Sequence, residues 1–297
     1  MPLRLLGSRA KVIHLIDGGS AVASGRRELG SVLGITGATG APGRTFLSIN
    51  LALALSAEGM RVALVDADPH LGSVAVQLDL AEDRSLTYLA HEAALKAVDD
   101  SLIARHLQST RGLDVLVGRS VAGLGDGIPA TLLSEVVKLL RRRYDVVVID
   151  SGALDCGAAQ AAALLCQLLV WIVVPTKLGI DLLDRTLSGP LASQVRARPS
   201  IVVLNRLESM ALRDVDSALR RRYGMAVGAA IAENHRACVK AEDQSRPAAL
   251  AGPLSSSIRR CAQTVALALA KVAEVPRADV GESRQSIGPP LLRESSQ

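Results

Sequence analysis

Aromatic residues are nearly missing from this 297-residue sequence, which contains one Phe, one Trp and three Tyr. A surface that stacks unpaired bases needs aromatic rings, so their scarcity argues against binding of single-stranded nucleic acid. Lysine is scarce as well: the 34 basic residues comprise six Lys and 28 Arg, a bias that a genome's coding preference can produce. The formal charge of +5 permits contact with nucleic acid or acidic lipid but indicates neither.

Cysteine and histidine are also few, with four Cys and five His. The Cys residues form no Cys-x-x-Cys pair and a chain of this length needs no disulfide framework, which favours a reducing cytoplasm. The His residues lack metal-ligand spacing, and the apolar stretch 12–16 is too short for the core of a signal peptide. With 49% hydrophobic and 21% charged residues and a mean hydropathy of +0.29, most of the chain is expected to fold.

One uncharged run, residues 156–176, is long enough for a membrane-spanning helix. Its first half is rich in Ala and its second half, 168–174, ends at Pro175. A short helix that leads into a buried parallel strand has the same composition. We therefore expect a strand here, because similar apolar runs recur along the chain.

Those runs alternate with helical patterns, which predicts βαβ units and a parallel sheet with helices on both faces. The carboxyl ends of the strands, and any ligand, then lie along one sheet edge. We expect residues 1–30 to be an extension, 31–275 one domain and 276–297 a flexible tail. The expected strands are 31–36, 62–66, 113–117, 145–150, 168–174 and 201–205, and the expected helices are 45–58, 131–143, 181–195, 212–223 and 255–275.

The turn after the first strand, residues 37–46, reads Gly-Ala-Thr-Gly-Ala-Pro-Gly-Arg-Thr-Phe. A turn between a strand and a helix N-terminus presents backbone N–H groups that bind phosphate. Compared with G-x-x-x-x-G-K-[ST], Gly43 and Thr45 match, whereas Ala38 and Arg44 replace the first Gly and the Lys. The pattern alone is a weak match, so its context decides.

Carboxylates follow two of the expected strands. Asp66 and Asp68 end the second strand, and Asp150 ends the strand at 145–150. At such a place a carboxylate can hold the water shell of a Mg²⁺ whose direct ligand is Thr45, and another can orient an attacking water. The alternatives are a solvated loop for Asp66 and Asp68, and a helix cap for Asp150.

In its loop, its carboxylates and the order of its elements, the sequence resembles the MinD/ParA group of deviant-Walker-A ATPases. The resemblance is strongest to the CpaE/TadZ-like branch of pilus-assembly and septum-site proteins. The resemblance runs from about residue 31 to 275 and includes the segments 48–54 and 203–206. It implies a three-layer, P-loop NTPase-like α/β fold with a mainly parallel sheet. It also implies binding of ATP or ADP with Mg²⁺, and a homodimer that pairs face to face across two nucleotides.

The resemblance also assigns roles by position. Thr45 would bind Mg²⁺ and Asp150 would support it through water. Asp68 would be the catalytic, water-positioning carboxylate with Asp66 as its support, and Asn205 would meet the adenine edge, although Asn is common wherever a strand turns into a loop. The nucleotide-binding loop would comprise Thr39, Gly40, Ala41, Gly43, Arg44, Thr45 and Phe46.

The loop departs from the family pattern K-G-G-V-G-K-[ST] at both lysines. Thr39 stands where the family has the lysine that reaches the partner subunit's nucleotide, and Arg44 stands at the second lysine. A guanidinium is a planar fork where a compact ammonium is expected, and Pro42 removes one backbone N–H. Because phosphoryl transfer depends on electrostatic stabilisation, these changes predict weak ATP hydrolysis.

We therefore expect a cytoplasmic nucleotide-binding protein that acts in pilus assembly, cell division or chromosome partitioning through nucleotide-linked dimerisation. It would work with a protein partner, with recruitment to a pole, septum or membrane-bound complex. The alternative is a catalytically dead pseudo-ATPase that serves as an interaction scaffold. The Arg clusters at 140–144 and 219–223 allow DNA contact and helix 255–275 allows membrane contact, but dipole-complementing helix ends and packing on the sheet are favoured.

Overall fold

The computed structural model describes residues 29–38, 40–68, 72–118, 128–154, 157–189, 192–208 and 212–274. Within these ranges eight strands form one sheet in the order β3-β4-β2-β5-β1-β6-β7-β8. Neighbouring strands are parallel except for β3 and β4. The strands are β1 (Ser31–Gly37), β2 (Val62–Asp66), β3 (Gln108–Thr110), β4 (Leu113–Leu116), β5 (Val146–Ala153), β6 (Leu168–Val173), β7 (Ser200–Leu207) and β8 (Ala226–Ala232).

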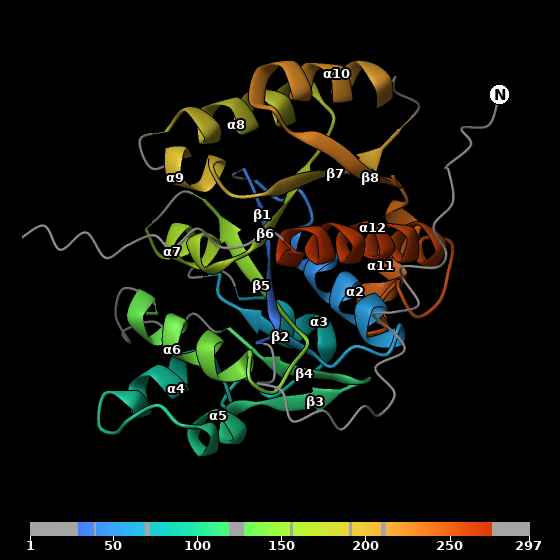
Figure 1. Cartoon of the computed structure of the whole chain (residues 1–297). Coiled ribbons are helices and arrows are strands. Elements are labelled where there is room, and N and C mark those ends of the chain that lie inside the picture. Colours follow the sequence, from blue (N-terminus) through green and yellow to red (C-terminus); the bar gives the residue numbers. More distant parts are fainter. Residues whose placement is uncertain are drawn as a thin grey trace, which may run out of the picture.

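Helices cover both faces of this sheet (Figure 1). On one face the buried core includes residues of α2 (Arg44–Ala57), α3 (Val74–Leu78) and α12 (Ser255–Glu274), with α11 (His235–Asp243) packed against it. The helices on the other face are α4 (Leu86–Ala93), α5 (Asp100–His106), α6 (Ala130–Leu140), α7 (Gly157–Leu165), α8 (Lys177–Ser188), α9 (Ala192–Arg196) and α10 (Leu212–Tyr223). The expected three-layer α/β fold is thereby confirmed.

The central strands are buried on both faces, as their composition predicts. Every residue of β2, β5 and β6 is buried, and such strands are continuous runs of apolar residues because helices cover both sides. Within the uncharged run 156–176, residues 157–165 form α7 and residues 168–173 form β6, the short helix and buried strand that were expected. Within the described residues no helix is long and apolar enough to cross a bilayer.

Two predictions of secondary structure were wrong. The single helix expected over 181–195 is two helices, because α8 ends at Ser188 and Gly189 follows in an extended conformation before Pro190. A residue before proline is disfavoured in the helical region, so the chain breaks there. The strands β3 and β8 were missed: β3 is three residues long, and β8 consists mostly of alanine and glycine, small residues that are largely half-buried and carry little strand signal.

The strand register places the acidic residues side by side. Asp66 at the end of β2 pairs with Asp150 on β5, and Gly37 at the end of β1 pairs with Ile172 on β6. Since these strands are parallel, their carboxyl ends share one edge of the sheet. That edge carries the loop into α2 and the residues considered next. The expected tail 276–297 and all but the last two residues of the expected extension 1–30 lie outside the described residues.

Candidate nucleotide site

The loop between β1 and α2 depends on two glycines with left-handed backbone. Gly40 has φ 89° and Gly43 has φ 95°, a region that side chains with a Cβ rarely adopt. Gly43 is the N-cap of α2, and its carbonyl accepts the Leu47 N–H at 3.0 Å. The helix thus begins at Arg44, and its first N–H groups are available to an anion. Thr39 lies outside the described residues.

Asn205 holds this loop from the end of β7. Its Nδ2 donates to the Pro42 carbonyl at 2.7 Å, and a Cβ built on Gly43 would lie 2.4 Å from the same nitrogen. Asn205 is buried and lines the cavity described below. The residue expected at the adenine edge is therefore also a support of the loop.

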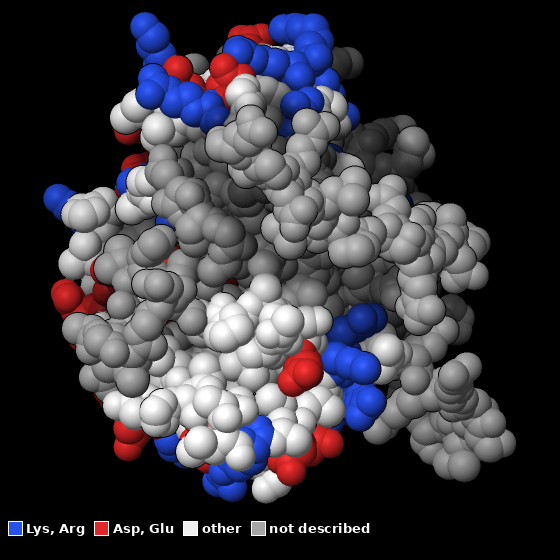
Figure 2. Space-filling model, turned by 90° about the vertical axis from the view of Figure 1, so that its left-hand side faces the viewer, with Lys and Arg blue, Asp and Glu red and all other residues white. Residues whose placement is uncertain are grey.

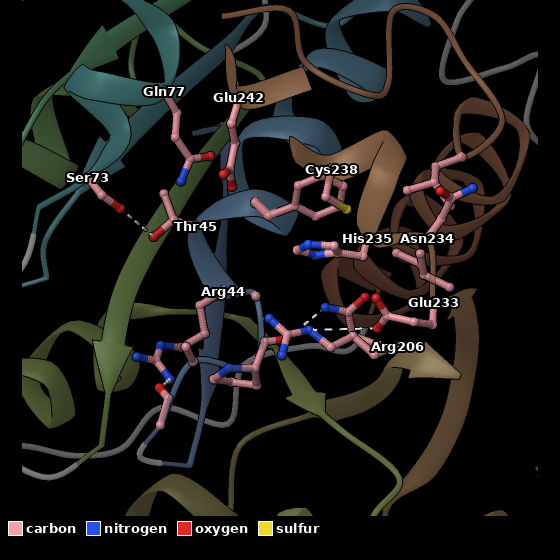
Figure 3. Close-up of a pocket in the computed structure, with 18 of the residues that line it drawn as sticks. Arg44, Thr45, Ser73, Gln77, Arg206, Glu233, Asn234, His235, Cys238 and Glu242 are labelled. Atoms are coloured by element: carbon pink, nitrogen blue, oxygen red, sulfur yellow. Dashed lines mark hydrogen bonds and ion pairs between the residues drawn. The ribbon is translucent and has the colours of Figure 1, made fainter. Parts of the chain in front are cut away.

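Arg44 points into the loop. Its Nη1 donates to the Ala38 carbonyl at 2.8 Å and to the Gly40 carbonyl at 3.2 Å, while its Nε is buried without a hydrogen-bond partner among the described residues. In Figure 3 the side chain runs away from Thr45 and bends back toward the loop. The charge that replaces the family lysine is thus directed at backbone carbonyls.

Thr45, in the first turn of α2, faces the carboxylates. Its Oγ1 accepts a hydrogen bond from the Ser73 hydroxyl at 3.2 Å (Figure 3). Asp150 is fully buried, and neither of its oxygens has a hydrogen-bond partner of ordinary geometry within the described residues, although the Thr45 hydroxyl favours its charged form. A buried carboxylate without partners is costly. Two hydroxyls beside it give the oxygen donor set that suits Mg²⁺, so the residues present fit this ion.

Asp66 and Asp68 differ in exposure. Asp66 is fully buried and accepts the N–H groups of Val74 at 3.1 Å and of Asp68 at 3.2 Å. Asp68 lies at the cavity wall. Asp66 thus fixes the segment that carries Asp68 through two hydrogen bonds.

Close packing raises the proton affinity of both buried acids. Burial, and then the charge of Asp150, raises the pKa of Asp66 to about 8. Burial, opposed by the Thr45 hydroxyl, raises the pKa of Asp150 to about 6. The two acids are register partners, so each charge disfavours the other. A cation placed near them would favour the charged forms of both.

A cavity of about 540 Å³ opens between the loop, β7, β8 and α11. Figure 3 shows His235 and Cys238 of α11 facing Arg206 and Glu233, on the side of the cavity away from Ser73 and Thr45. Arg206 and Glu233 form an ion pair at 4.0 Å. Sequence reasoning missed this half because it missed β8. The expected site residues that line the cavity are Gly40, Ala41, Gly43, Arg44, Thr45, Phe46, Asp68 and Asn205, whereas Asp66 and Asp150 do not line it.

The arginine cluster at 219–223 is largely paired with acids. Arg220 contacts Asp216 at 2.8 Å, and Asp184 accepts hydrogen bonds from Arg222 and from the Tyr223 hydroxyl. Figure 2 shows basic side chains gathered with acidic ones at the top of the view, where Figure 1 places α8 and α10. This surface therefore carries mixed charge.

A phosphate-type loop, hydroxyls beside buried carboxylates and an adjoining cavity at the carboxyl edge of a parallel sheet define the class of nucleotide-binding α/β proteins. The family model described as "CobQ/CobB/MinD/ParA nucleotide binding domain" matches residues 33–245. The chain therefore belongs to this family, as the loop and carboxylates indicated.

Similar proteins agree with this assignment. Septum site-determining protein MinD of Synechocystis is 25% identical over 190 residues, which are 60% of this chain and 69% of that protein. Chromosome partitioning protein ParA of Myxococcus xanthus is 30% identical over 164 residues, 50% of this chain and 57% of that protein. The structure of MinD from Pyrococcus horikoshii, complexed with Mg-ADP, has a TM-score of 0.68 at 20% identity and covers 83% of this chain and all of that one.

Proposed function

We propose that the chain binds ATP and ADP with Mg²⁺ in the cavity and acts in spatial positioning or assembly at a septum, a pilus or a partitioning chromosome. The observation that carries the proposal is the fully buried carboxylate of Asp150 beside Thr45 at the start of α2, which has no hydrogen-bond partner of ordinary geometry among the described residues. The MinD and ParA relatives, named for septum placement and chromosome partitioning, support the wider role. The altered loop favours the CpaE/TadZ-like branch.

In this proposal each residue has a distinct task. Gly40, Ala41, Gly43 and the first turn of α2 hold the phosphates through backbone N–H groups. Thr45 binds Mg²⁺ and Asp150 orients its water shell; the ion would neutralise charge on the phosphates.

The remaining site residues either take part in ATP hydrolysis or contact the bound nucleotide. Asp68, held by Asp66, positions the attacking water, and Phe46 and Asn205 contact the nucleotide. The chain works in the cytoplasm as a homodimer with a protein partner, and is recruited to a pole, septum or membrane-bound complex.

Titration of the purified chain with ATP and Mg²⁺ in a calorimeter tests nucleotide binding. We expect saturable heat in the micromolar to low millimolar range, because the loop amides and helix terminus remain even though both lysines are absent. Absence of heat up to millimolar ATP would contradict the proposal. It would leave the second candidate, a pseudo-ATPase scaffold.

That second candidate is favoured by the bonds from Arg44 to the loop and by the missing N–H of Pro42. The double variant Thr39→Lys with Arg44→Lys restores both family lysines. It distinguishes a slow ATPase from a chain that cannot hydrolyse ATP at all. We expect ATP hydrolysis to rise at least about tenfold, because two positive charges return to the phosphates.

Asp68→Ala in the lysine-restored chain is the matched control, and it should remove the gained turnover while nucleotide still binds. No gain in the double variant, with nucleotide bound, would show that the rest of the site is inactive.

A further inference from the structure

We infer that Arg44 is a positioning residue that holds the loop closed, and that the cavity therefore recognises the diphosphate common to ADP and ATP without preferring ATP. This inference rests on the proposed function, since it requires that a nucleotide binds. It concerns how the chain responds to the state of the nucleotide. A site with equal affinity for both nucleotides does not select ATP over ADP when the two are present at equal concentration.

The Arg44 side chain spans the loop and is held on both sides of it. Its Nη1 bridges the Ala38 and Gly40 carbonyls across the loop. Its Cδ lies 3.7 Å from where a Cβ on Gly37 would be, so the side chain packs against the end of β1. To reach a terminal phosphate, the guanidinium would have to break its hydrogen bonds to both carbonyls. This costs free energy, because the carbonyls would lose their donor. A guanidinium fork suits two acceptors at once, whereas an ammonium does not have this geometry.

The charge around Thr45 is negative. Among the described residues that line the cavity, the Lys and Arg side chains are those of Arg44 and Arg206. Arg206 lies away from Thr45 and pairs with Glu233 (Figure 3). Near Thr45 the cavity wall carries Asp68, with Asp66 and Asp150 buried behind it. A third phosphate at this end would meet carboxylates. Apart from the Mg²⁺ that Thr45 would bind with either nucleotide, no side-chain cation of the described lining is free to offset its charge.

The loop offers backbone N–H groups to the first two phosphates of either nucleotide. These backbone N–H groups lie at the start of α2, directly after the left-handed Gly43. The hydrogen bond from Arg44 to the Ala38 carbonyl of the loop fixes their arrangement. These groups serve ADP and ATP equally. A loop held in shape before the ligand arrives gains affinity through pre-organisation, so loss of Arg44 should weaken both nucleotides together.

Calorimetric titration of the full chain with Mg·ADP, and separately with Mg and the β,γ-imido analogue of ATP, tests the inference. We expect the two dissociation constants to agree within about threefold. Arg44→Met, which keeps the length but removes the fork, should weaken both by a common factor on the order of tenfold and lower Tm. Arg221→Met, at an exposed position of α10, is the matched control and should change neither constant.

Each result has one meaning. A wild-type preference for the ATP analogue of tenfold or more, on the order of 1.4 kcal/mol, would overturn the inference while the proposed function stands. An Arg44→Met chain that loses affinity only for the ATP analogue, or that binds both ligands with unchanged affinity and Tm, would also overturn it. No binding of either nucleotide by the wild type would instead contradict the proposed function. If Arg44→Met does not fold, the wild-type ratio alone decides.

Discussion

Asp150→Asn is expected to make the nucleotide-free protein more stable and to remove its response to Mg²⁺. The asparagine keeps the shape of the side chain but places no charge in a fully buried position, where neither Asp150 oxygen has a hydrogen-bond partner of ordinary geometry among the described residues. Above pH 6, where Asp150 is charged in the wild type, removal of this charge should stabilise the fold by about 2 to 3 kcal/mol. A carboxylate that orients the ligands of a metal contributes about 10- to 100-fold to metal affinity, so Mg²⁺ should cease to strengthen nucleotide binding.

The gain in stability should depend on pH in a defined direction. Burial raises the pKa of Asp150 to about 6 in the folded state, whereas an unfolded Asp titrates near pH 4. The folded wild type therefore binds the proton more tightly, and the stability present below pH 4 is lost as pH rises toward 6. Asp66, with its pKa raised to about 8 by burial and then by the charge of Asp150, extends the loss in the wild type; in Asp150→Asn the second cause is absent, so this further loss is smaller.

Chemical unfolding at several pH values measures this difference. Wild type and Asp150→Asn should have similar unfolding free energies near pH 4 and diverge up to pH 8, the variant being the more stable. Asp145→Asn is the matched control, because Asp145 immediately precedes the same strand but is exposed and pairs with Arg61. A destabilised Asp150→Asn at pH 8, with Asp145→Asn near wild type, would contradict the account of Asp150 as an uncompensated charge.

Gly43→Ala is expected to disrupt the loop itself. The new Cβ would lie 2.4 Å from Nδ2 of Asn205, which donates to the Pro42 carbonyl, and φ of 95° is strained for alanine. Strain and collision together should lower the unfolding free energy by about 3 kcal/mol. Because the first N–H groups of α2 would shift with the loop, nucleotide affinity should fall on the order of 100-fold.

Gly59→Ala separates strain from collision. Gly59 has φ 90° just beyond the end of the same helix, but no atom of the described residues lies within 4 Å of its Cβ position. It should cost about 1 to 2 kcal/mol from backbone strain and leave nucleotide affinity unchanged. Thermal unfolding and calorimetric titration of both variants give the comparison, and equal losses in the two would show that the contact with Asn205 is unimportant.

Much of this arrangement was predictable from sequence because parallel strands leave a strong pattern. The apolar runs that became β2, β5 and β6 fixed the edge at which Asp66 and Asp150 meet. The conformation of Arg44 was not predictable, since the sequence specifies a charge at that position but not the carbonyls that it contacts. The wall formed by Glu233 and His235 was missed with β8, whose small residues carry no clear periodicity.

The shortage of aromatic residues has a spectroscopic consequence. Trp171 is the chain's one tryptophan; it is 1% exposed in β6, and its Nε1 has no hydrogen-bond partner among the described residues. An indole so shielded from water emits at short wavelength, and its emission moves to the red when the core opens. Since Trp171 pairs with Thr36 of β1, one residue before Gly37, the protein carries a label-free optical probe of its own sheet, adjacent to the phosphate loop.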